Sequence, residues 1–341
     1  MCTPIFCVLP SAEVLMKLFI RVLGLAFLLV PAITAAPQQH DKDAAAPPPW
    51  AYATIPPGVT APPDDGSTHR IPGSDKALTR TQILDAFNAV DWHPEEHPAM
   101  PDIIEYGKKP GVRACGYCHQ PNGLGRPESA SLAGLSAAYI EQQVADFKNG
   151  TRRSSKPEIG PQTAMSSIGE AVAETDARTA AEYFSALKLT PWIRVVETTT
   201  VPKTTVVGFM LMPVEGAGKE PIGDRIIEVP KDGERTELRD PASGFIAYAP
   251  VGSVKKGEAL VTTGGAGKTL RCAICHGADL RGLGPVPALA GRSPSYIFRQ
   301  LFDLQHGSRH GLWSELMKGP VAKLSQDDMV SIAAYLASRK P

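Results

Sequence analysis

The sequence predicts a mainly α fold, with two similar helical domains joined by a partly β segment. Three observations carry this prediction. The pattern C-x-x-C-H occurs twice, the residues around its first copy recur around its second, and a stretch rich in β-branched residues separates the copies. With 341 residues, of which 43% are hydrophobic, the chain is long enough for two compact domains and connecting segments.

We expect five segments along the chain. Residues 1–36 are a signal peptide, residues 37–76 a proline-rich tether, residues 77–190 the first domain, residues 191–252 an interdomain segment with short strands, and residues 253–341 the second domain. The 35 Lys and Arg residues balance the 35 Asp and Glu residues. The overall charge therefore points neither to nucleic acid nor to an anionic membrane as a partner.

The N-terminus resembles an export signal. Between Met16 and Ala36, a basic start is followed by an apolar run and then by small residues. Because Met16 is the better start, residues 1–15, with Cys2 and Cys7, should carry no function. The alternative is a membrane anchor, but the uninterrupted apolar run is too short to span a bilayer comfortably. We predict a periplasmic protein without stable membrane insertion after signal cleavage.

Each C-x-x-C-H copy places two thiols on one helical turn, with a histidine beside the second thiol. This arrangement suits covalent haem attachment, because the thiols reach the two vinyl groups and the histidine presents a ring nitrogen to the iron. A thioredoxin-like redox pair needs no adjacent histidine, and a zinc site would leave the histidines unexplained. The sequence predicts two covalently bound haem c groups, held by Cys115, Cys118, His119, Cys272, Cys275 and His276.

An internal repeat extends beyond the motifs. An offset of 157 residues places residues of the first domain on identical residues of the second: Tyr139 on Tyr296, Asp146 on Asp303, and Arg152 on Arg309. A five-residue difference then changes the offset to 152, at which Met165 falls on Met317. We interpret the two halves as copies of one duplicated domain.

Each iron needs a sixth ligand, and a methionine thioether is the soft donor that holds such a haem at high potential. Met165 and Met317, each in a predicted loop before the last helix, fit this role; the alternative is that both are core residues. Three other methionines are expected in the core: Met210, Met212 and Met329. Four histidines without a repeat partner could replace a methionine and are otherwise expected at surface or loop positions: His93, His97, His306 and His310.

Two long helices are predicted in each domain, over residues 136–148 and 175–187 and over residues 293–305 and 325–338, after a helix that leads into the motif. Aromatic residues recur on these helices and should pack on the porphyrin or in the core: Tyr139, Phe147, Tyr183, Tyr296, Phe302 and Tyr335.

The interdomain segment contains three runs rich in β-branched residues, at 195–201, 204–211 and 225–229, which predict short strands. We expect this segment to pack between the domains and to fix their orientation. The alternative is that it forms a docking surface for a partner enzyme.

The pattern of motif, Leu-x-Gly step, Tyr-led helix, methionine and Ala-x-Tyr helix resembles the class I cytochromes c, and most closely their soluble tandem members, over residues 77–190 and 253–339. The resemblance implies that His119 and His276 are proximal ligands and that Met165 and Met317 are distal ones. It also implies that a carbonyl of residues 284–287 accepts a hydrogen bond from the His276 ring. In the first half the proline of the corresponding loop is displaced, which leaves the acceptor for His119 open.

Two capped irons would make the protein an electron carrier without catalytic residues. Its partners would be a donor dehydrogenase, an acceptor oxidase or another cytochrome. The alternatives are a cytochrome subunit of a periplasmic dehydrogenase or oxidase complex, and a haem enzyme such as a dihaem peroxidase. After signal cleavage no unpaired cysteine remains, so a Cys-ligated haem of the thiosulfate dehydrogenase type is not expected.

Overall fold

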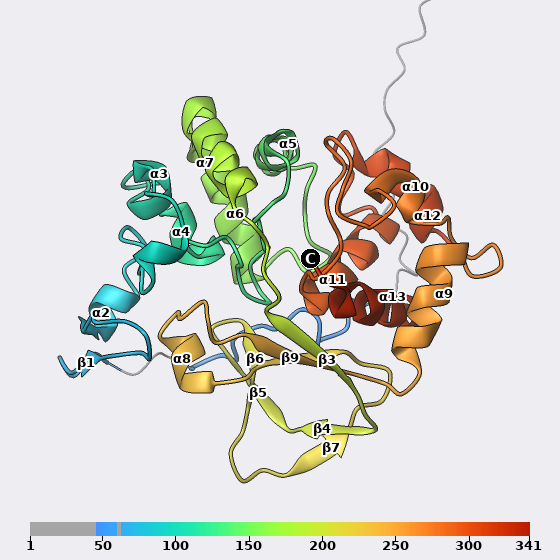
Figure 1. The fold of residues 1–341 in the computed structure, drawn as a ribbon, viewed down its shortest axis with the longest axis horizontal. Coiled ribbons are helices and arrows are strands. Elements are labelled where there is room, and N and C mark those ends of the chain that lie inside the picture. The colour runs from blue at the N-terminus through green and yellow to red at the C-terminus, as the bar shows by residue number, and fades with distance from the viewer. Residues whose placement is uncertain (1–45, 60–62) are drawn as a thin grey trace, which may run out of the picture. The chain divides into compact units, whose positions relative to one another are not determined.

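The structure is a computed structural model that describes residues 46–59 and 63–341 (Figure 1). The predicted signal peptide, with Met16, Cys2 and Cys7, lies outside these residues. Residues 46–341 form one compact unit. Among the described residues, no helix is long and apolar enough to cross a membrane.

The first repeat contains short helices before the long ones. Its helices are α2 (Arg80–Ile83), the 3-10 turn η1 (Pro94–Glu96), α3 (Asp102–Glu105), α4 (Cys115–His119), α5 (Ala137–Lys148), α6 (Gly160–Ala171) and α7 (Glu174–Ala186). The Ser136 hydroxyl caps α5 by accepting a hydrogen bond from the Tyr139 amide. The helices predicted over residues 136–148 and 175–187 are therefore confirmed.

The second repeat follows the same order. Its helices are α9 (Ser253–Thr263), α10 (Ala273–His276), α11 (Pro294–Gln305), the 3-10 turn η2 (Ser314–Met317), α12 (Lys318–Val321) and α13 (Gln326–Ser338). Ser293 caps α11 as Ser136 caps α5, and Ser325 begins α13 with a capping box. α9 crosses α13 so closely that Gly257 has no room for a Cβ beside the Ser331 carbonyl. The two predicted long helices are confirmed here too.

The segment between the repeats is built from short strands and α8 (Gly233–Glu237). In its three-stranded sheet, β3 (Ile193–Glu197) pairs in parallel with β9 (Phe245–Ala249), and β9 pairs antiparallel with β8 (Ile227–Pro230). Two-stranded pairs are formed by β5 (Thr204–Val207) with β6 (Met210–Pro213), by β4 (Thr200–Pro202) with β7 (Lys219–Pro221), and near the N-terminus by β1 (Thr68–His69) with β2 (Leu78–Thr79).

The prediction of strands in the three runs is confirmed. The structure adds β7, which lies outside these runs, and differs in two further ways. The run 204–211 is a hairpin, because Gly208 and Phe209 both adopt positive φ and turn the chain between β5 and β6. The central strand β9 was not predicted, because its run Phe245–Ala249 contains a single β-branched residue, Ile246.

Each repeat has its own hydrophobic core. One core includes residues of α3, α5 and α7, and the other is built largely on α9, α11 and α13. The aromatic residues Tyr139 and Tyr183 lie in the first core, and Phe302 and Tyr335 in the second. The methionines predicted to be core residues, Met210, Met212 and Met329, are all buried.

The tether prediction for residues 37–76 is wrong for its central part. Trp50 packs on Phe298 of α11, and Tyr52 is 1% exposed and donates a hydrogen bond to the Asp303 carboxylate at 2.8 Å. The physical reason is that Trp50 and Tyr52 offer large apolar surfaces, which proline content alone did not reveal.

The expectation that His93 lies at the surface is also wrong. Its ring is buried and lies 3.3 Å from the Asp240 carboxylate. His97 is half-buried and contacts Asp91, whereas His310 is exposed as expected. A buried carboxylate partner explains how His93 can leave water.

Candidate functional site

The two C-x-x-C-H motifs form short helical turns, α4 and α10. In each turn the two cysteines are three positions apart and lie on the same turn of helix. None of the four cysteines forms a disulfide. Burial raises the pKa of Cys115 to about 12 and that of Cys272 to about 11. A catalytic dithiol needs a lowered pKa, so these protonated thiols do not favour a thioredoxin-like redox pair.

The motif histidines are held in the same way in both repeats. The Nδ1–H of His119 donates to the Ala130 carbonyl at 2.8 Å, and that of His276 donates to the Pro287 carbonyl at 2.8 Å. Burial lowers the pKa of both rings, which favours the neutral form. Because Nδ1 carries the proton, Nε2 keeps a free lone pair that can bind a metal.

This geometry identifies the hydrogen-bond acceptor of the His119 ring, which the sequence left open. Ala130 and Pro287 stand at equivalent positions of the repeat, so the acceptor is the backbone carbonyl whether or not a proline supplies it. The predicted contact within residues 284–287 is present, and the displaced proline of the first half changes nothing in the hydrogen bond.

Matching backbone hydrogen bonds build the loop that carries this carbonyl. The amides of Gly125 and Gly282 donate to the carbonyls of His119 and His276, at 2.9 and 2.8 Å. Both glycines have positive φ, and a Cβ would lie 2.6 Å from the Ala130 carbonyl oxygen in one loop and 2.8 Å from the Val286 carbonyl oxygen in the other. Only glycine fits these two turns.

The last helix closes each loop. The Gly134 amide donates to the Phe184 carbonyl of α7 at 3.0 Å, and the Gly291 amide donates to the Leu336 carbonyl of α13 at 2.9 Å. In both repeats, the glycine of the Leu-x-Gly step thus connects the loop after the motif to the last helix of the same repeat. The same backbone frame surrounds both histidines.

The predicted methionine ligands lie on different local structures. Met165 lies inside α6, and Met317 is the last residue of η2, packed against the core of the second repeat. The prediction that both lie in loops is therefore wrong, because each falls in the helical segment that precedes the last helix. Both side chains are half-buried, and their role as ligands remains a prediction.

A nearly symmetric polar cluster joins the two repeats. Backbone groups of Arg152 and Arg309, which are equivalent residues, form an antiparallel bridge. Arg152 donates to Gln143 at 2.9 Å and to Tyr296 at 2.8 Å, and Arg309 donates to Gln300 at 2.9 Å and to Tyr139 at 3.1 Å. Within the described residues neither guanidinium forms an ion pair with a carboxylate.

The sequence carried a signal for this cluster. Arg152 and Arg309 fall on each other in the repeat, as do Gln143 and Gln300. The repeat revealed that these residues were retained, but it did not reveal that the copies meet one another across the interface.

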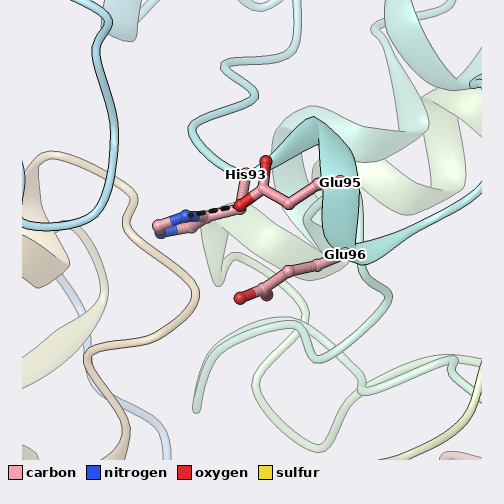
Figure 2. A group of neighbouring side chains, drawn as sticks. All are labelled: His93, Glu95 and Glu96. Carbon is pink, nitrogen blue, oxygen red and sulfur yellow. Dashed lines mark ion pairs between the residues drawn. The ribbon is translucent and has the colours of Figure 1, made fainter.

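A further group of side chains, His93, Glu95 and Glu96, lies on and beside the turn η1 (Figure 2). The His93 ring points toward Glu95, with 3.6 Å between Nδ1 and the carboxylate. Both glutamates are exposed, and the other ring nitrogen faces Asp240. These contacts suffice to explain the buried ring as a structural residue.

No family model matches the chain, but curated proteins do. The chain is 37% identical over 86 residues to cytochrome c-554(547) of Halothiobacillus neapolitanus. This match covers 22% of this chain and 94% of that protein. It is 40% identical over 77 residues to cytochrome c4 of Pseudomonas aeruginosa, covering 22% of this chain and 37% of that protein. The chain thus spans about two fifths of the length of the cytochromes c4 that it matches.

A longer match extends over both halves of the chain. It is 25% identical over 233 residues to a thiosulfate dehydrogenase electron acceptor of Thiomonas intermedia and covers 67% of this chain and 80% of that protein. A match of this length is more than one repeat can supply.

Proposed function

This chain belongs to the c-type cytochromes, and on that premise we propose that it carries single electrons between redox proteins through two covalently attached haems. One haem would be bound by Cys115 and Cys118 and the other by Cys272 and Cys275. The observation that carries the proposal is the duplicated frame, in which each motif histidine donates Nδ1–H to an equivalent carbonyl at 2.8 Å.

The residues of each site fit a haem. Two thiols on one turn match the two vinyl groups, and a neutral imidazole with a fixed tautomer matches the iron. Bound haem supplies a one-electron change at its iron. The protein holds the ring nitrogen in place and keeps much of the surrounding surface apolar, so little has to rearrange when the charge changes.

Met165 and Met317 would complete the two iron centres. Each precedes the paired tyrosine of the last helix by the same number of residues, and each is half-buried. A thioether at the sixth position leaves no open coordination site, which favours electron transfer over catalysis.

The arginine cluster would serve both haems. Arg152 and Arg309 lack a carboxylate partner within the described residues, and a guanidinium in low dielectric is stabilised by an anion. The propionate carboxylates of a bound haem are such anions. The cluster would thus connect the two sites as well as the two repeats.

A second candidate function is that of an electron-accepting subunit in a dehydrogenase complex. The match to a thiosulfate dehydrogenase electron acceptor, over 67% of this chain, favours it. Export to the periplasm fits both candidates, since haem c is attached outside the cytoplasm and residues 16–36 resemble a signal peptide.

The test is a haem count with a ligand-binding measurement on the purified holoprotein. Two haems per chain should remain after acid–acetone extraction, and the reduced protein should not bind carbon monoxide. One haem per chain would refute the two-site assignment. Carbon monoxide binding by the unmodified protein would show an open iron and would favour a haem enzyme. Co-purification of a dehydrogenase would favour the subunit role.

A further inference from the structure

The two attachment turns differ in what covers them. Tyr117 of α4 and Ile274 of α10 are equivalent residues between the two cysteines of their motifs. The Arg239 guanidinium, from the interdomain segment, lies 3.7 Å from the centre of the Tyr117 ring and donates to the Tyr117 carbonyl. Ile274 is 59% exposed.

The loops that follow the motifs show the same contrast. Leu124 is buried in a cluster with Trp192, Met210 and Phe245 of the interdomain segment. Arg126 is 8% exposed and donates to the Thr236 carbonyl at 3.5 Å, whereas the equivalent Leu283 is 64% exposed. The interdomain segment therefore packs on the first loop around Leu124 and Arg126, whereas in the second loop it reaches Gly291 and leaves Leu283 exposed.

A third contact lies at the helix that carries Met165. Phe209 packs against the start of α6 so closely that Gly160 has no room for a Cβ. In the second repeat, no described residue covers the segment before Met317 in this way, and its apolar side chains are exposed: Leu312, Trp313 and Leu316. All three elements around the first site are thus in contact with the interdomain segment.

The cover is fixed rather than loosely placed. The indole N–H of Trp92 donates to the Leu238 carbonyl at 2.7 Å. Asp240 has a fully buried side chain that contacts the His93 ring at 3.3 Å and pairs with Arg235. Buried polar contacts of this kind hold Leu238 and Asp240 on Trp92 and His93, and Arg239 between them contacts α4.

The two repeats also differ in net charge. Residues 253–341 contain 12 Lys and Arg against 6 Asp and Glu, whereas residues 77–190 contain 11 against 14. Exposed basic residues stand near the uncovered turn, including Arg271 directly before Cys272 and Lys318 directly after Met317, which pairs with the exposed Glu315. An apolar face with a basic surround is complementary to an acidic partner surface.

We propose that the chain exchanges electrons with an acidic redox protein at the face around Cys272–His276, and that residues 236–240 close the equivalent face of the first repeat. This inference rests on the proposed carrier function. One electron would leave the reduced partner, which is oxidised, and would be accepted by the haem that Cys272, Cys275 and His276 would hold. The haem held by Cys115, Cys118 and His119 would exchange electrons with partners by way of that second haem.

The test uses the holoprotein and fully reduced flavodoxin, an acidic flavoprotein, as the electron donor. Arg271→Glu and Arg113→Glu form a matched pair, because both arginines are exposed and each stands just before the first cysteine of its motif. At low salt Arg271→Glu should slow the second-order reduction rate about tenfold, whereas Arg113→Glu should change it less than about twofold. High salt should remove the difference.

Leu283→Glu is a second variant at an exposed position, and it should also slow the reaction at low salt. Equal slowing by Arg113→Glu and Arg271→Glu would overturn the proposal. Salt-insensitive reduction by flavodoxin together with binding to phosphatidylglycerol vesicles would overturn it too, in favour of a membrane surface. Reduction by dithionite and reoxidation by ferricyanide test the carrier function separately from the docking face. If both haems are reduced and reoxidised but the variants behave alike, only the docking face is wrong and the carrier function stands.

Discussion

The two repeats agree inside and differ outside. Around His119 and His276 the same backbone hydrogen bonds recur at nearly the same lengths, although most side chains have changed. On the outer faces, Tyr117 lies under Arg239, while its equivalent Ile274 is exposed. Duplication has thus preserved the frame that holds a ring nitrogen and has left the outer surface free to diverge.

The interface between the repeats belongs with the preserved parts. Arg152 and Arg309 bridge each other, and each donates to the tyrosine of the opposite repeat. An arrangement in which equivalent residues meet across a two-fold axis is typical of an isologous contact between two copies. The single chain retains the symmetry of a dimer at this point, and the interdomain segment breaks it elsewhere.

The largest expected effect comes from removing one predicted distal ligand. Met317→Ala should lower the potential of one haem by on the order of 0.1 V or more, because a thioether stabilises ferrous iron. The reduced variant should bind one carbon monoxide per chain. Spectroelectrochemical titration and carbon monoxide difference spectra measure the two effects.

Met165→Ala is the matched control, and it sharpens the comparison. It should also bind one carbon monoxide, but more slowly than Met317→Ala, because Phe209 and the interdomain segment cover α6. Equal association rates in the two variants would show that the cover does not restrict access to the first site. A variant that binds no carbon monoxide would remove that methionine from the ligand set.

A smaller effect is expected at the symmetric interface. Arg152→Ala and Arg309→Ala each remove hydrogen bonds from a charged group to glutamine and tyrosine, and each should cost about 2 kcal/mol of unfolding free energy. Because the two arginines share partners, the double variant should cost less than the sum. Denaturant unfolding of the three variants measures this, and strict additivity would contradict a shared cluster.

The smallest effect is a pH dependence confined to the first repeat. The Asp91 carboxylate, 3.1 Å from the His97 ring, raises the pKa of His97. A raised folded-state pKa adds stability below the ordinary value of about 6.5, and this stability is lost as the pH rises through the folded-state value. The contribution should be about 0.5 kcal/mol.

His97→Gln should therefore flatten the dependence of the unfolding free energy on pH above the ordinary histidine pKa of about 6.5. Asp91→Asn should do the same, because it removes the partner that raises the pKa. No change of slope in either variant would contradict the assignment. This pH dependence is expected only in the first repeat. There Tyr183 contacts His97 at 3.2 Å, whereas the equivalent Tyr335 of the second repeat lies next to Arg339.

The sequence alone determined the local parts of this protein. Two motifs, the offset of 157 residues and the helical spacing of recurring aromatic residues were sufficient to predict the repeats, the long helices and the histidine at each site. These features depend on residues that are close in the chain or paired by the repeat. The family could be recognised for the same reason.

Only the tertiary structure decided which surfaces are covered. Arg239 reaches Tyr117 across 122 positions of sequence, and Tyr52 reaches Asp303 across 251. No periodicity or motif links such distant residues, because their contact depends on how separate elements pack rather than on local conformation. The same reason hid the buried site of His93 and the meeting of Arg152 with Arg309, and it is this long-range packing that makes two equivalent sites unequal.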